Sequence, residues 1–319
     1  MTTELLAGLA EILLGSWVFT NAVEWLGYRF KLPSGFLGSF VAAVATALPE
    51  TLVPIVAIVT GCREGVAIGA ILGAPLMLST LAMGMGGLTV ALAHALGHRD
   101  DPHVRCDQLR LDAPHFLAAY SLVLLATVFH HRILRYAIAA ALLLLYARYL
   151  RRLIREGAPP EAPSIPLRVA NPAAAAALAT LLIAASVALM VLGAEGFARG
   201  VEELSLSLGL SPLLVSSLLT PVATELPEKV NSVIWYARGR DRLALGNVTG
   251  AMVFQATFPV SIGLTLTGWS LSTRDLAYLV VPTIAVLTLY VRGRRGRLDW
   301  PSMVAVSLLY PVPTLVSSG

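Results

Sequence analysis

A six-residue string that ends in Leu-Pro-Glu occurs twice in this chain, at an offset of 178 residues between Glu50 and Glu228. The first copy reads ATALPE and the second reads ATELPE, and each lies inside an apolar stretch. A carboxylate at membrane depth costs on the order of 2.5–3.5 kcal/mol even on the mildest scale, so such residues mark ion pathways and binding sites. The repetition therefore predicts a cation site that is assembled from two copies of one unit.

Each string offers several oxygen ligands on one helical face. Thr46 precedes Glu50 by four residues and Thr224 precedes Glu228 by four, so each hydroxyl shares a face with its carboxylate. The prolines of both strings, and Pro221 in addition, donate no helical hydrogen bond and leave backbone carbonyls free. Carboxylates, hydroxyls and carbonyls together suit a hard cation such as Ca²⁺. The alternative is that the two glutamates cap helix breaks or pair with buried arginines.

The second copy is richer in polar groups than the first. Glu225 lies three residues before Glu228, and Asn231 and Gln255 follow in the same half. Two carboxylates this close tend to hold a proton between them, which favours proton-coupled exchange. Lys229 leaves two alternatives open: it neutralises Glu225 in a purely structural pair, or it is a built-in cation that replaces a coupling ion.

The elements that position these residues are membrane-spanning helices. Hydrophobic residues make up 56% of the 319 residues, charged residues make up 13%, and the mean hydropathy is +0.75. A water-soluble chain of this length needs more charge on its surface, and spanning backbone must satisfy its own hydrogen bonds, so we expect an all-α polytopic membrane protein. Ten spans are predicted, at residues 4–28, 35–60, 64–93, 113–130, 133–150, 172–198, 210–237, 243–268, 275–291 and 299–316.

The basic residues predict the orientation of these spans. If the N-terminus lies outside, the inward loops carry seventeen Lys and Arg residues and the outward loops carry five, with Lys229 inside a span. This bias predicts a multi-pass protein of the cell inner (plasma) membrane with both termini outside the cytoplasm. It also accounts for the pI near 9.3, so we expect the lipid bilayer and cations as partners and no nucleic acid.

The chain divides into two related halves. Residues 1–150 form a first five-helix repeat, residues 151–171 form a Pro- and Arg-rich cytoplasmic linker, and residues 172–319 form a second repeat. After the strings the offset becomes 177, so that Arg63-Glu64 aligns with Arg240-Asp241 and Gly73 aligns with Gly250. Because five is odd, the second repeat must be inverted, which is the architecture of many secondary transporters. We expect helices 2 and 7 to be broken at Leu-Pro-Glu.

These strings, with the run from Gly239 to Gly250 that leads into the eighth span, resemble the calcium/cation antiporter superfamily of sodium/calcium exchangers. The resemblance implies ten spans in two inverted halves, backbone ligands at Ala43 and Pro221, and first and sixth spans that slide against a rigid core. Family positions that bind cations through polar side chains are here Ala74 and Leu78 in the first half. In the second half they are Ala251 and Gln255.

We therefore predict a secondary active cation antiporter, which is not an enzyme and needs no cofactor, that most readily exchanges Ca²⁺ against H⁺ or Na⁺ by alternating access. The predicted cation ligands are Glu50 and Glu228, supported by Thr46, Thr224, Glu225, Gln255, Asn231 and the carbonyls of Ala43 and Pro221. Two alternatives remain: a cation-binding membrane protein whose transport site has changed or decayed, and an exchanger for another cation. The oligomeric state stays open.

A second polar cluster lies in the loop that follows the third span. His94, His98, His103 and Cys106 surround Asp100-Asp101 there. Such residues suit a transition metal, and the alternative is a merely solvated loop.

Overall fold

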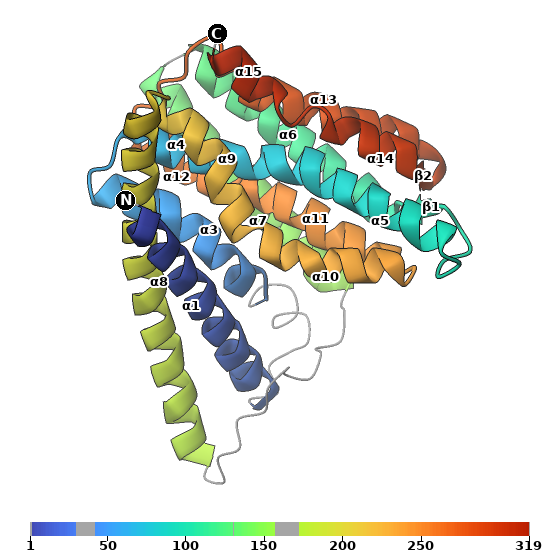
Figure 1. The fold of residues 1–319 in the computed structure, drawn as a ribbon, viewed down its shortest axis with the longest axis horizontal. Coiled ribbons are helices and arrows are strands. Elements are labelled where there is room, and N and C mark those ends of the chain that lie inside the picture. Colours follow the sequence, from blue (N-terminus) through green and yellow to red (C-terminus); the bar gives the residue numbers. More distant parts are fainter. Residues whose placement is uncertain (1, 30–41, 130, 157–171, 319) are drawn as a thin grey trace.

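A computed structural model of the chain describes residues 2–29, 42–129, 131–156 and 172–318, and nearly all of them are helical (Figure 1). The helices of the first half are α1 (Thr2–Arg29), α3 (Ala42–Val59), α4 (Glu64–Met77), a π-helical turn η2 (Leu78–Ala82), α5 (Met83–Ala95), α6 (Asp107–Phe129) and α7 (Arg132–Glu156). Those of the second half are α8 (Pro172–Leu208), α9 (Pro212–Thr224), α10 (Leu226–Ala237), α11 (Asp241–Gln255), α12 (Phe258–Leu266), α13 (Ala277–Arg292), the 3₁₀ turn η3 (Gly293–Arg295), α14 (Trp300–Ser307) and α15 (Val312–Ser318).

Local sequence explains where these helices begin and end. Ser211 accepts the amide of Leu214 as the N-cap of α9, and Asp299 caps α14 in the same way through the amide of Ser302. Gly209 and Gly239 follow α8 and α10 with positive φ angles of 66° and 70°, a conformation that ends a helix at little strain only in glycine.

Seven helical segments within the described chain are long and apolar enough to cross a membrane. They do not include the predicted spans 35–60, 210–237 and 275–291. The first begins among residues outside those described, the second is divided at Glu225, and the helix in the third has 16 residues. The chain is therefore a helical multi-pass membrane protein, while the count of ten spans stays a prediction.

The loops of this helical protein add a small β-ribbon. Strand β1 (His103–Arg105) pairs antiparallel with β2 (Arg297–Asp299), with Val104 opposite Leu298. Both of these central side chains are fully buried. The ribbon therefore joins the loop after α5 to the loop after α13 and seals the core beneath it.

The centre of the bundle is the continuous helical segment formed by α4, η2 and α5. Its residues are almost all buried, and it packs closely against α9. At Gly73 an added Cβ would lie 2.2 Å from the carbonyl oxygen of Ser217, and at Gly69 it would lie 2.4 Å from that of Leu213. Only glycine permits backbones to approach this closely.

Helices α1 and α8 form a separate pair at one side of the bundle and extend beyond it (Figure 1). Their backbones meet at glycines: a Cβ on Gly8 would lie 2.5 Å from the carbonyl oxygen of Gly193, and a Cβ on Gly15 would lie 2.9 Å from that of Ser186. Much of the remaining surface of both helices is exposed, so the pair has far fewer contacts with the rest of the bundle than α4 does.

The two Leu-Pro-Glu strings have different backbones. Helix α3 runs without interruption through Pro49 and Pro54, so the break that we predicted in the first copy is not seen there. In the second copy α9 ends at Thr224 and α10 begins at Leu226, with Glu225 between them. Even here the amide of Glu225 donates to the carbonyl of Pro221 at 2.8 Å, and the amide of Lys229 donates to the carbonyl of Glu225 at 3.3 Å. Because these helical hydrogen bonds remain, the junction is a kink and not a complete break.

Candidate functional site

One side-chain amide joins two buried carboxylates from opposite halves of the chain. Nε2 of Gln255 lies 2.5 Å from Oε2 of Glu50 and 2.8 Å from Oε1 of Glu225. The relative exposures are 7% for Glu50, 0% for Glu225 and 1% for Gln255. An amide with two N–H groups suits this bridge, because each carboxylate receives one donor. Residues from α3, the α9–α10 junction and the C-terminal end of α11 therefore meet at one point.

Lys229 completes this group from the first turn of α10. Its Nζ lies 3.4 Å from Oε2 of Glu225, which accepts no hydrogen bond from the described part of the chain, and 3.3 Å from the carbonyl oxygen of Asn247. The residue is 2% exposed. The side chain of Asn247 in turn donates to Oγ of Ser232 at 2.8 Å, which ties α11 to α10. Sequence reasoning left the direction of Lys229 open and missed Asn247 and Ser232.

The (i, i+4) spacing of Glu225 and Lys229 is the signal that predicts this contact, since residues four apart share a helical face. Asn247 belongs to the Gly246-Asn247-Val248-Thr249-Gly250 run that was already notable in the sequence. Ser232 carries no comparable signal.

Of the two predicted backbone ligands, Ala43 and Pro221, the structure gives a hydrogen-bond partner for the carbonyl of Pro221. The carbonyl of Pro221 accepts the amide of Glu225 at 2.8 Å, so it is already used within the helix. The proline of the second string, Pro227, also lacks an amide donor, and the carbonyl four residues before it belongs to Ala223. By the same logic Pro49 frees the carbonyl of Ala45. The carbonyls freed by the two strings are therefore those of Ala45 and Ala223.

The other predicted ligands divide into three groups. Thr224 is buried beside the junction, and its hydroxyl donates to the carbonyl of Thr220 at 2.9 Å. Asn231 is exposed and lies two residues beyond Lys229 on α10. The side chains of Ala43, Thr46 and Glu228 lie outside the described residues, although all three backbones are helical.

The positions that the family resemblance singled out on the central helical segment, and Ala251 on α11, carry apolar side chains. Ala74 and Leu78 are buried in the central helical segment, and Ala251 is half-buried on α11. The hydroxyls of Ser79 and Thr80, on the same segment, donate to the carbonyl of Leu76 at 3.2 and 2.5 Å. The described polar atoms of the site therefore come from α3, the α9–α10 junction and α11.

These residues form an electrostatic unit with more negative than positive charge. Glu50 and Glu225 carry two carboxylates and Lys229 carries one ammonium, all in a region from which water is largely excluded. A buried carboxylate needs a cation or several donors to remain ionised. The arrangement can therefore hold a small cation next to Glu50, with the amide of Gln255 connecting that cation to the Glu225–Lys229 pair.

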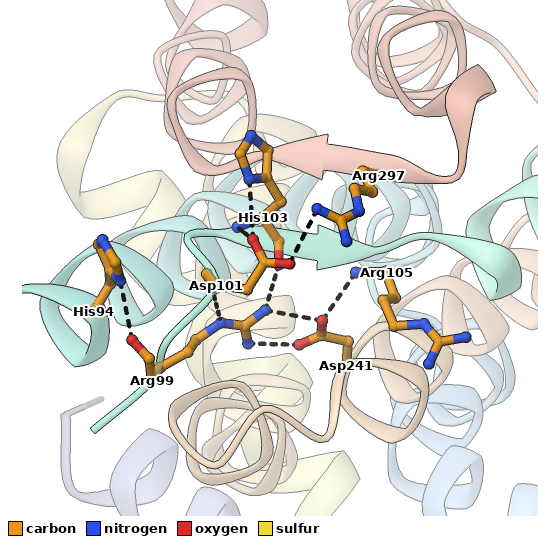
Figure 2. Close-up of polar contacts among 7 residues, drawn as sticks. All are labelled: His94, Arg99, Asp101, His103, Arg105, Asp241 and Arg297. Atoms are coloured by element: carbon orange, nitrogen blue, oxygen red, sulfur yellow. Dashed lines mark hydrogen bonds and ion pairs between the residues drawn. The ribbon is translucent and has the colours of Figure 1, made fainter. Parts of the chain in front are cut away.

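The histidine-rich loop is organised around Arg99 (Figure 2). The guanidinium donates to both carboxylate oxygens of Asp241 on α11, at 2.6 and 2.8 Å, and to the carbonyls of Asp101, His103 and Tyr236. Asp241 also accepts the amide of Arg105 at 2.8 Å. Both charged side chains are only 5% exposed. The loop is thus an ion-paired junction that fastens the first half to the start of α11.

The transition-metal interpretation of this loop gains no support from the structure. Among the described residues, no three His, Cys, Asp or Glu side chains converge on one point. His94 contacts the carbonyl of Arg99, and Cys106 donates its thiol to the carbonyl of Gly293 at 3.0 Å. Hydrogen bonds from the backbone and ring of His103 lower the pKa of Asp101, which lies on the exposed side of the loop.

A matching junction lies at the start of α4. Oε1 of Glu64 accepts the amide of Trp269 at 2.9 Å, and Arg135 donates to the carbonyls of Thr267 and Gly268. The indole N–H of Trp269 donates to Thr127 at 2.9 Å. Glu64 and Asp241 are the residues that align at an offset of 177, and each accepts a backbone amide from a loop of the other half.

Comparison with known proteins adds family information to this geometry. Residues 3–155 and 178–319 match the family model described as "Sodium/calcium exchanger protein". A putative antiporter, CaxA, of Alkalimonas amylolytica is 26% identical over 126 residues, which is 38% of this chain and 40% of that protein. The chain thus spans less than half the length of that relative.

Solved structures share the fold along nearly the whole chain. The crystal structure of the H⁺/Ca²⁺ exchanger CAX aligns with a TM-score of 0.76 at 17% identity, covering 99% of this chain and 84% of that one. The sodium-calcium exchanger NCX_Mj aligns with a TM-score of 0.58 at 21% identity, covering 98% and 97%. Identities this low show a common fold alone.

Proposed function

Because the chain belongs to the sodium/calcium exchanger family, whose members are membrane transporters and not enzymes, we propose that it is a secondary active antiporter that exchanges Ca²⁺ against H⁺ or Na⁺. The observation that carries this proposal is the meeting of Glu50 and Glu225 at Gln255. Carboxylates from two halves of one chain, held in a buried site, are the ligands that a hard cation requires. The similar solved exchangers are named for H⁺/Ca²⁺ and sodium-calcium exchange, so both counter-ions enter the proposal.

The proposed cation ligands are Glu50 and Glu228, with Thr46 and Thr224 beside them and the Ala45 and Ala223 carbonyls at the two strings. Gln255 orients Glu50 by donating to it. The amide holds Oε2 of the carboxylate in a fixed orientation, which is how neighbouring residues commonly orient metal ligands.

The proposed architecture is an inverted pair of five-helix repeats in the inner membrane with both termini outside. The two loop junctions support it: Glu64 holds a second-half loop at Trp269, and Asp241 holds a first-half loop at Arg99 and Arg105. Two halves related by an inverted duplication place equivalent acidic residues at opposite ends of the bundle.

Alternating access would involve the α1–α8 pair. These helices pack on each other through glycine contacts and have limited contact with the bundle, whereas α4 and α9 interlock at its centre. Motion of the pair would expose the site first to one side of the membrane and then to the other, with the ion-paired junctions keeping the remaining helices together.

The test is flux in reconstituted vesicles. Ca²⁺ uptake is followed under an imposed pH gradient and, separately, under a Na⁺ gradient, for the parent and for Glu50→Gln and Glu228→Gln. The proposal expects gradient-driven uptake by the parent and its loss in both variants, while Glu195→Gln, which alters a partly exposed pair with Arg199, transports as the parent does.

A second candidate, a cation-binding membrane protein without exchange, is favoured by the apolar side chains of Ala74 and Leu78 at positions where the family resemblance implies polar ligands. It predicts saturable cation binding with no response of flux to either gradient. Flux with no counter-ion dependence would instead indicate a channel-like uniporter.

A further inference from the structure

The Glu225–Lys229 pair is placed where it acts on the proposed cation site. Nζ of Lys229 contacts one carboxylate oxygen of Glu225, and the other oxygen accepts from Gln255, which also donates to Glu50. A chain of contacts through Glu225 and Gln255 thus connects the ammonium to Glu50. Among the described side chains of α4, none places a polar atom between the ammonium of Lys229 and the carboxylate of Glu50. No side-chain dipole of that helix therefore screens the interaction between the two charges.

The surroundings of the ammonium are those of a monovalent cation site. The contacts of the ammonium include a carboxylate oxygen at 3.4 Å and the carbonyl oxygen of Asn247 at 3.3 Å. Carboxylate and carbonyl oxygens are the ligands of alkali cations as well as of hard divalent ones. An ammonium on a four-carbon stem is a compact point charge of the same sign. Lys229 therefore supplies covalently what a bound alkali ion would supply reversibly.

A structural role alone accounts poorly for this pair. Replacing a buried ion pair by apolar residues of similar volume is often neutral or stabilising, so such a pair does not by itself make a membrane helix more stable. Neither partner of this pair is free to turn toward water, since their exposures are 0% and 2%. The remaining property is charge: the carboxylate of Glu225 keeps the positively charged ammonium of Lys229 at a constant position beside the site.

We propose that the ammonium of Lys229 permanently occupies a monovalent cation subsite at Glu225, so that the chain binds a divalent cation without needing Na⁺ at this position. The inference rests on the proposed function, which places that cation at Glu50 and Glu228. Three glutamates and one lysine then leave two negative charges, which match one divalent cation. Lys229 is thus the residue that determines specificity, because its ammonium replaces a bound alkali cation such as Na⁺.

The main test removes the ammonium and asks whether Na⁺ takes its place. Thermal stability of the purified protein is measured in NaCl and in N-methylglucamine chloride at equal ionic strength. The parent and Lys229→Arg are expected to respond alike, since any Na⁺ effect in them reports a counter-ion at the proposed cation site. Lys229→Met is expected to gain an additional rise in melting temperature that saturates with Na⁺, and Glu225→Gln/Lys229→Met is expected to lose that additional rise because it lacks the carboxylate.

A second variant keeps the proposal testable if Lys229→Met does not fold. Glu225→Gln leaves the ammonium without its carboxylate, and its repulsion is expected to weaken Ca²⁺ binding at least about tenfold. The double variant, which also lacks the ammonium, is expected to recover most of that loss. A Na⁺ response of folded Lys229→Met that does not exceed the parent's, or no recovery in the double variant, overturns the inference.

The two proposals fail in different ways. The Na⁺ response is read from stability and needs no transport, so it can be present or absent whatever the flux. If the parent neither binds Ca²⁺ nor transports it, the proposed function fails, while a Na⁺ response that is larger in Lys229→Met than in the parent still identifies the subsite.

Discussion

Gln255 and Glu50 are separated by 205 positions in the chain, and yet Nε2 of the amide lies 2.5 Å from Oε2 of the carboxylate. The contact joins the end of α11 to α3 and brings the two halves together at membrane depth. The same nitrogen lies 2.8 Å from Glu225. One uncharged side chain therefore sets the distance between two buried charges.

Removal of this bridge is expected to affect both stability and cation binding. Gln255→Met keeps the volume but removes both donors, and hydrogen bonds to charged groups contribute about 1.5–3 kcal/mol each. We expect a lower melting temperature and weaker Ca²⁺ binding.

The matched control is Gln108→Met, because Gln108 donates to a different buried carboxylate, Asp112, at 3.0 Å. It should lower the melting temperature while the Ca²⁺ affinity stays at the parent value. Equal Ca²⁺ affinities in the two variants would contradict the bridging role of Gln255.

The Arg99–Asp241 junction is expected to be a major contributor to stability. Breaking a buried pair by removing one partner costs about 3–5 kcal/mol, because the other charge stays buried without compensation. Arg99→Met should therefore lower the free energy of unfolding by that amount, and Arg99→Met/Asp241→Asn should lose less than the sum of the single variants. Denaturation of purified protein measures both.

Arg199→Met is the control for this pair, since its exposed pair with Glu195 should contribute about 0–1 kcal/mol. If Arg99→Met and Arg199→Met are equally stable, the loop does not fasten the two halves as described.

The glycines that align between the halves are expected to respond differently to the same substitution. A Cβ on Gly73 would lie 2.2 Å from the carbonyl oxygen of Ser217, whereas a Cβ on Gly250 would lie 3.5 Å from the hydroxyl of Tyr149. Gly73→Ala should cost about 1–3 kcal/mol or more, and Gly250→Ala should be within about 0.5 kcal/mol of the parent because alanine favours helix. The melting temperatures of the two variants test this prediction. Equal decreases in melting temperature would contradict the close contact between α4 and α9.

Thiol labelling tests the proposed orientation. Cys62 is half-buried between α3 and α4, and burial raises the pKa of its thiol, whereas Cys106 is fully buried. In Cys106→Ala, a membrane-impermeant maleimide should label intact cells at Cys62. Because the thiolate is the reactive form and its pKa is raised, the rate should still increase with pH above neutrality. Labelling only after the membrane is opened would place this loop inside.

The membrane class and the family could be predicted from the sequence because both depend on patterns that any backbone must respect. Long apolar runs specify helices in lipid, and the repeated ATALPE and ATELPE strings are an unusual combination of proline and carboxylate. The family model confirms the resemblance to sodium/calcium exchangers.

The details of the site could not be read in the same way. Proline was expected to break both helices, but α3 continues through Pro49 because an internal proline removes one hydrogen bond without ending a helix that neighbours hold in place. The Arg99–Asp241 pair spans 142 positions, and a contact of that range has no local signal. For Lys229 the sequence left open whether it neutralises Glu225 in a structural pair or serves as a built-in cation, and the structure adds its contacts with Glu225 and with the carbonyl of Asn247.

Equilibrium binding of Ca²⁺ to the purified chain and to Glu50→Gln and Glu228→Gln, with Glu195→Gln as control, tests the central claim most directly. The account predicts one saturable Ca²⁺ site in the parent and in Glu195→Gln, and its loss in each of the other two variants. Binding by Glu50→Gln and Glu228→Gln with the parent's affinity would contradict the assignment of the cation site to these two glutamates.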